Sequence, residues 1–107
     1  MLESRIQADI VKHLHERGLF CHSIPNEQGH GNAIRTGQLI SMGMWPGVAD
    51  LVIWISPGKI AYLEIKNEKG RQSDRQIQFQ QRCLDNGFPY AVVRSVEDVD
   101  RFLGELV

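Results

Sequence analysis

The sequence lacks the features that would place a protein in a membrane or carry it out of the cell. Its longest fully apolar runs span only a few residues, such as Leu51–Ile55, whereas a membrane-spanning helix needs about 20. The first residues carry Glu3 and Asp9 and show no small-residue cleavage site after an apolar core, which is unlike a secretory signal. The two cysteines, Cys21 and Cys83, lie far apart. We therefore expect no membrane partner and two reduced thiols in a cytoplasmic protein.

An excess of basic residues is also absent, and so is a zinc-binding pattern. Twelve Lys and Arg residues against thirteen Asp and Glu residues give a net charge of −1, whereas a passive nucleic-acid coat is usually strongly basic. A protein of this charge that handles nucleic acid must concentrate its positive charge locally or borrow it from a metal ion. The histidines and cysteines show neither C-x-x-C nor H-x-x-x-H spacing, which argues against a structural zinc site.

The sequence does contain the pattern of one small α/β domain. Its 107 residues, 42% hydrophobic and 23% charged, fit a single globular unit. Helical periodicity and capping residues predict helices over residues 3–17, 34–42, 73–86 and 96–106. Runs rich in β-branched and aromatic residues predict strands over residues 19–24, 50–55, 60–66 and 90–94. The order αβ(α)ββαβα predicts a small mixed sheet with helices on its faces.

One predicted strand carries a carboxylate and an ammonium side by side. Because side chains alternate between the faces of a strand, Glu64 and Lys66 share one face of residues 60–66, and the opposite face is apolar. Asp50 begins the preceding strand, and residues 56–59 (Ser-Pro-Gly-Lys) predict a tight hairpin between the two. That hairpin brings Asp50 next to Glu64 and Lys66.

Two carboxylates and a lysine at one end of a sheet suit metal-dependent hydrolysis of a phosphodiester. Carboxylates supply hard oxygen ligands for Mg²⁺, which polarises the phosphate and lowers the pKa of a bound water. The ammonium can orient that water or neutralise the transition state. The alternative interpretation is a surface salt bridge between Glu64 and Lys66, with Asp50 as a turn residue; such a pair contributes little stability.

The motifs around these residues resemble the PD-(D/E)xK nucleases and, among them, the VRR-NUC branch. Residues 46–51 (PGVADL) and 63–66 (LEIK) are similar to the superfamily signature, with Ala-Asp in place of Pro-Asp. Residues 69–76, 86–87 and 91–95 look like the branch, as do Glu3, Ile6, Gln7 and Ile10 and the pair Pro25-Asn26. The motifs occur in the right order over nearly the whole chain. The resemblance implies one nuclease domain over residues 1–107 with a restriction-endonuclease-like fold.

The resemblance implies a role for each matching residue. Asp50 and Glu64 would bind Mg²⁺, for which Mn²⁺ can substitute, and the Ile65 carbonyl would be a further ligand. Lys66 would be the catalytic lysine. Glu3 resembles an outer acidic residue that reaches the metal through water.

Gln76 resembles an extra catalytic motif of the branch, on the helix after the core strands, but it also has a structural interpretation. Ser73-x-x-Gln76 is a capping box, in which the glutamine bonds back to the Ser73 amide. We expect that one side chain can hardly serve both purposes. For Glu3, the structural alternative is a favourable interaction with the dipole of its own helix.

The basic residues near the predicted site are candidates for binding DNA. Lys69-Gly70-Arg71 predicts a turn between the site strand and the next helix, suited to holding a phosphate beside the metal. Arg75 follows on that helix, and Arg35 lies in the glycine-rich stretch 26–47. A solvated charged loop is the alternative. Glu27 and His30, in the same stretch, receive no role.

The resemblance implies a Mg²⁺-dependent endodeoxyribonuclease that leaves 5′-phosphate and 3′-hydroxyl ends. Without a further DNA-binding domain in these residues, we expect it to select DNA by shape, in branched or flapped structures. The chain resembles stand-alone members of bacterial and phage type, which suggests that the Holliday junction is its substrate. The alternatives are a catalytically silent nucleic-acid-binding module on the same fold, against which the intact set Asp50, Glu64 and Lys66 argues, and a plain interaction domain.

Resolving a four-way junction requires two symmetric nicks, which predicts a homodimer with two-fold symmetry. Met42, Met44 and Trp45 offer an adaptable, partly aromatic contact surface for the second copy. The alternative is that these three residues cover the edge of the sheet.

Overall fold

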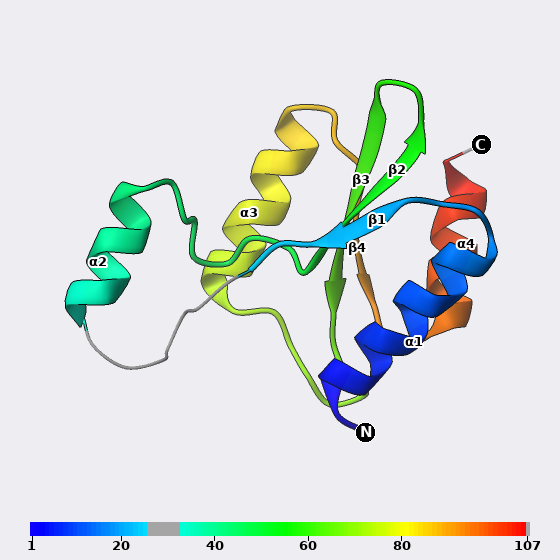
Figure 1. Ribbon diagram of the computed structural model, residues 1–107, viewed down its shortest axis with the longest axis horizontal. Coiled ribbons are helices and arrows are strands. Elements are labelled where there is room, and N and C mark those ends of the chain that lie inside the picture. The colour runs from blue at the N-terminus through cyan, green and yellow to red at the C-terminus, as the bar shows by residue number, and fades with distance from the viewer. Residues whose placement is uncertain (26–32, 107) are drawn as a thin grey trace.

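The computed structural model describes residues 1–25 and 33–106 (Figure 1). In chain order its elements are α1 (Glu3–Glu16), β1 (Cys21–Ser23), α2 (Ala33–Ser41), β2 (Leu51–Ser56), β3 (Lys59–Ile65), α3 (Asp74–Asp85), β4 (Tyr90–Val93) and α4 (Val96–Glu105). The predicted α/β fold class is confirmed, and each predicted element ends within two residues of its observed bounds. Asn26, Glu27 and His30 lie outside the described residues.

The sheet is mixed, with the strand order β1-β2-β3-β4. β2 pairs antiparallel with both β1 and β3, and β4 pairs with β3 in parallel. Figure 1 shows α1 and α4 on one side of the sheet and α3 on the other, with α2 standing apart from the sheet. Of the described helices, none is long and apolar enough to span a membrane.

The two faces of the sheet bury different side chains. Toward α1 and α4, alternate residues of β2 and β3 form an apolar cluster that includes Leu51, Leu63 and Ile65. Toward α3 lies a second, smaller cluster, in which the free thiol of Cys83 packs near Tyr90. Because side chains alternate along a strand, the residue between Leu63 and Ile65 must point toward the α3 side. That residue is Glu64.

A close backbone contact holds the start of β2 against α3. Gly47 has a φ of +90°, and a Cβ built on it would lie 2.5 Å from the carbonyl carbon of Arg75. Only glycine accepts both this dihedral angle and this contact without strain. The chain that leads into Asp50 therefore passes directly over the first turn of α3, which also carries Gln76.

Candidate active site

The β2–β3 hairpin brings Asp50 to the end of β3. Leu51 pairs with Leu63 across the two strands, and the Ile65 amide donates a hydrogen bond of 2.7 Å to Oδ2 of Asp50. The amide and carbonyl of one strand residue point to the same side, so the Ile65 carbonyl also faces the β2 side of β3. Two of the predicted metal ligands, the Asp50 carboxylate and the Ile65 carbonyl, thus lie at the same edge of β3.

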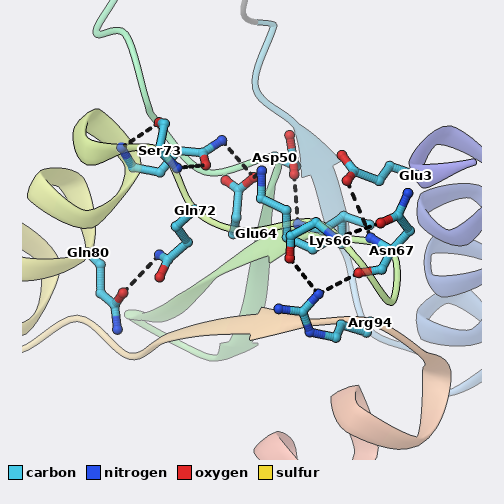
Figure 2. A network of polar contacts seen from close by, with 12 residues as sticks. Glu3, Asp50, Glu64, Lys66, Asn67, Gln72, Ser73, Gln80 and Arg94 are labelled. Carbon is cyan, nitrogen blue, oxygen red and sulfur yellow. Dashed lines mark hydrogen bonds and ion pairs between the residues drawn. The ribbon is translucent and has the colours of Figure 1, made fainter.

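Glu64 and Lys66 form a buried pair, unlike the surface salt bridge considered as the alternative. Their side chains are 2% and 11% exposed, and 3.6 Å separates Oε2 of Glu64 from Nζ of Lys66. Oε2 also accepts a hydrogen bond of 3.0 Å from Nε2 of Gln76 (Figure 2). Oε1 of Glu64 is buried and has no hydrogen-bond partner among the described residues. One oxygen of a buried carboxylate is therefore left without a donor.

The surroundings of Glu64 disfavour its charged form. Burial raises the pKa of Glu64, and the negative charge of Asp50 raises it further, to about 8, although Lys66 acts in the opposite direction. Buried polar atoms without partners are uncommon and call for an explanation. A cation beside Oε1 would supply the missing partner and would reverse the effect of Asp50.

The donor set matches a hard divalent cation. Among residues 1–25 and 33–106, no group of three or more His, Cys, Asp or Glu side chains is arranged to hold a metal ion. Asp50, Glu64 and the Ile65 carbonyl instead supply two carboxylates and one backbone oxygen. Mg²⁺ is usually bound by one or two carboxylates, with water and substrate phosphates completing its octahedral shell. The residues present therefore fit Mg²⁺.

Gln76 caps the N-terminus of α3 and donates a hydrogen bond to Glu64 at the same time. Its Oε1 accepts from the Ser73 amide at 2.8 Å, and the Ser73 hydroxyl accepts from the Gln76 amide at 3.2 Å, which completes the capping box. Its Nε2 meanwhile donates to Glu64. The capping box therefore does not occupy the whole side chain, because the acceptor and the donor of a carboxamide point in different directions. The catalytic role of Gln76 stays a prediction.

Glu3 reaches the site from the first turn of α1. Its Oε2 accepts a hydrogen bond of 3.3 Å from the amide of Asn67, the residue directly after Lys66. Figure 2 shows the Glu3 side chain extending from α1 toward the end of β3. Residues 3 and 67 are far apart in the sequence, and the packing of α1 over the sheet brings them together.

Comparisons with known proteins identify the family and the fold of this chain. The family model of the VRR-NUC domain matches residues 1–97. The chain belongs to the VRR-NUC family. A solved structure described as a VRR_NUC domain superposes with a TM-score of 0.69, covering 98% of this chain and 97% of that chain at 21% identity, which shows a shared fold. No curated protein matches the chain. A VRR-NUC domain is a nuclease-type domain, which implies DNA as its substrate.

The predicted DNA-binding residues of this VRR-NUC domain are exposed where the structure describes them. Lys69 and Arg71 lie in the turn between β3 and α3, and Arg75 lies in the first turn of α3. None of these three forms an ion pair with another described residue. Arg35 lies on α2, and the structure describes its backbone but not its side chain.

Sequence reasoning missed two residues beside the site, Asn67 and Arg94. The Asn67 side chain accepts from the amides of Lys69 and Gly70, a local turn that an asparagine after a strand can indicate. Arg94 comes from the end of β4 and donates to the carbonyls of Asn67 and Gly70. The segment 91–95 carried the family resemblance, but nothing in it connected Arg94 with residues 67–70.

The burial of Glu64 predicts a pH-dependent stability. In the presence of a chelator, the free energy of unfolding should fall as the pH rises from about 4.5 to about 8, because the folded protein keeps a proton that the unfolded chain has lost. The steepest slope for one proton is about 1.4 kcal/mol per pH unit. Denaturant unfolding at a series of pH values measures it.

The Glu64→Gln variant should flatten this pH dependence, since a carboxamide does not titrate in this range. Glu105→Gln, at an exposed position at the end of α4, is the matched control and should keep the wild-type slope. Equal slopes in the Glu64→Gln and wild-type proteins would contradict the raised pKa.

Proposed function

We propose that this VRR-NUC domain is a Mg²⁺-dependent endonuclease that hydrolyses phosphodiester bonds in branched DNA. The observation that supports the proposal is the Glu64 carboxyl group, which is buried beside Asp50 and whose Oε1 has no hydrogen-bond partner in the described part of the chain. A buried carboxyl group with an oxygen that lacks a hydrogen-bond partner is costly, and a fold that only bound a partner would have no use for one. The same argument speaks against a catalytically silent module.

Each residue of the site has a chemical part in this proposal. Asp50, Glu64 and the Ile65 carbonyl would hold Mg²⁺, or Mn²⁺ in its place, and Glu3 would contact it through water. When bound, the metal polarises the scissile phosphate and makes a nearby water more acidic. The donor from Gln76 engages Oε2 of Glu64 and so leaves Oε1 available to the cation.

Lys66 is the residue proposed to act on the reacting phosphate. Its ammonium, 3.6 Å from Glu64, can orient the attacking water or offset the negative charge that builds up on the phosphate oxygens. Water attacks phosphorus, the bond to the 3′ oxygen breaks, and the products carry a 5′-phosphate and a 3′-hydroxyl.

The charge distribution supports selection by DNA shape. Of the exposed basic side chains near the site among the described residues, Arg94 bonds to the turn after β3. Three others, available to DNA, belong to that turn and to the start of α3: Lys69, Arg71 and Arg75. Phosphate contacts of this kind orient a duplex but carry no base sequence. A substrate is then distinguished by how its strands bend and diverge, as in flaps and four-way junctions.

Exposed apolar residues after α2 support a working homodimer. Met42 is 81% exposed and Trp45 48%, so Met42 does not cover the sheet edge as the alternative expected. Trp45 instead lies against α3, with the Arg82 guanidinium 5.0 Å from its ring centre, and Met44 is half-buried. A second copy seated here would supply the second site that junction resolution needs.

Asp50→Asn and Glu64→Gln should each abolish cleavage while DNA binding survives or tightens. Two carboxylates repel a phosphate, and removing one negative charge relieves that repulsion while removing the metal ligand. Cleavage of labelled duplex, flap and four-way junction DNA with Mg²⁺ or Mn²⁺, together with binding by fluorescence anisotropy, measures both effects.

The control for these two variants is Glu105→Gln, which makes the same chemical change at an exposed position at the end of α4. It should cleave like the wild type. Near wild-type cutting by Asp50→Asn or by Glu64→Gln would show that the metal assignment is wrong.

Lys66→Ala should lower the cleavage rate at least about a hundredfold, the range for losing one donor that stabilises a transition state. Lys66→Arg should restore little of the lost cleavage rate, because a planar guanidinium does not replace a compact ammonium in a buried site. Single-turnover kinetics measure both rates. Lys59→Ala, at the exposed opposite end of β3, is the control, and a fully active Lys66→Arg variant would count against a positioned catalytic lysine.

Light scattering at micromolar concentration should give twice the chain mass of 12.2 kDa. Met42→Glu should reduce the mass to that of one chain and impair paired nicking of junctions. Leu84→Glu, at an exposed apolar position of α3, is the matched control. If the wild type has the mass of one chain and still cuts junctions fully, the proposed homodimer and the proposed preference for junctions are both wrong.

A further inference from the structure

The chain makes a tight hydrogen-bonded turn directly after Lys66. The Gly70 amide donates to the Asn67 carbonyl at 3.2 Å. The Asn67 side-chain oxygen accepts from the amides of Lys69, at 3.0 Å, and Gly70, at 2.7 Å. We call residues 67–70 the lysine turn, since it begins where the strand with Lys66 ends.

One side chain from another strand joins the two ends of the lysine turn. A single guanidinium nitrogen of Arg94 donates to the Asn67 carbonyl and, at 2.8 Å, to the Gly70 carbonyl (Figure 2). The Arg94 amide makes a separate bond of 2.9 Å to Asp98, which belongs to the start of α4. The side chain can therefore be changed without removing that backbone bond.

The lysine turn touches two of the proposed functional side chains. Its Asn67 amide holds the Glu3 carboxylate at 3.3 Å. A Cβ at Gly70 would lie 2.7 Å from Oε2 of Glu3 and 3.2 Å from Cδ of Lys66. The turn thus forms one wall against which both Glu3 and Lys66 lie, and a shift of the turn would move them.

We propose that Arg94 is a positioning residue of the nuclease site. By holding the carbonyls at both ends of the lysine turn, it fixes the direction of the Asn67 amide, which in turn holds Glu3 beside Lys66. This inference rests on the proposed function. Displacing groups near reacting atoms by about 1 Å can cost a hundredfold in rate, so a brace outside the reaction centre can matter to catalysis.

The kinetic test compares Arg94→Met, which has no donors, with Arg94→Lys, whose ammonium can still donate to two carbonyls. Arg94→Met should lower kcat at least about tenfold with KM within about twofold of the wild type, and Arg94→Lys should recover part of the loss. Arg101→Met, at an exposed position on α4, is the control. A change confined to KM would make Arg94 a phosphate contact and overturn the proposal.

A double-mutant cycle tests whether Arg94 acts through Glu3. Glu3→Gln and Arg94→Met should not be additive in kcat, because both break the same chain of contacts. The double variant should be about as slow as the slower single variant. Losses that multiply would show that the two residues act independently and would overturn the proposed route.

Hydrogen exchange, followed by NMR with a chelator present, tests the brace without any cleavage. The Asn67 and Gly70 amides should exchange at least about tenfold faster in Arg94→Met than in the wild type. The Lys66 amide, bonded to the Val93 carbonyl at 3.1 Å, is the internal control and should be unaffected. Unchanged exchange at Asn67 and Gly70 would refute the brace.

The two proposals fail in different ways. If Asp50→Asn and Glu64→Gln cleave normally while exchange at the lysine turn responds to Arg94→Met, the nuclease assignment of the site is wrong and the brace stands. If those two variants are inactive while Arg94→Met cleaves normally, only the positioning role of Arg94 is wrong.

Discussion

The arrangement of the site depends on the burial of one carboxyl group, that of Glu64. Glu64 is 2% exposed at the end of the central strand pair, and removing a carboxylate from water costs several kcal/mol unless other groups replace the lost hydrogen bonds. Gln76 and Lys66 engage one of its oxygens. Neither satisfies the other oxygen. The fold thus keeps a buried carboxyl group with a raised pKa and one unbonded oxygen beside a second carboxylate, an arrangement typical of functional sites.

Segments from distant parts of the chain meet near that carboxylate, and close approaches at two glycines hold them in place. Gly47 lies against the backbone of α3 at Arg75, where no side chain fits. This contact keeps the approach to Asp50 over the helix that carries Gln76. Gly70 lies against the Glu3 carboxylate in a similar way. Both glycines allow elements from distant parts of the chain to approach the site more closely than larger residues would.

The site also shows how one polar side chain can cap a helix and contact a buried carboxyl group at the same time. Gln76 completes a capping box at the N-terminus of α3 and donates to Glu64. The helix cap fixes the glutamine, so its amide group is held toward Glu64 before any ligand binds. A group that is already oriented loses little entropy when it acts, which is why preorganised donors are effective in active sites.

The sequence by itself determined the elements and the pairing of Asp50 with Glu64 and Lys66. Alternation along one strand and a short hairpin are local rules, and they suffice to bring these three residues together. Local rules do not show how deeply Glu64 is buried, because its cover comes from a helix packed on that face of the sheet. They also do not show that Glu3 meets Asn67, or that Arg94 holds residues 67–70. Those contacts join segments far apart in the chain, so they depend on how α1 and β4 pack against β3, which only the tertiary structure decides.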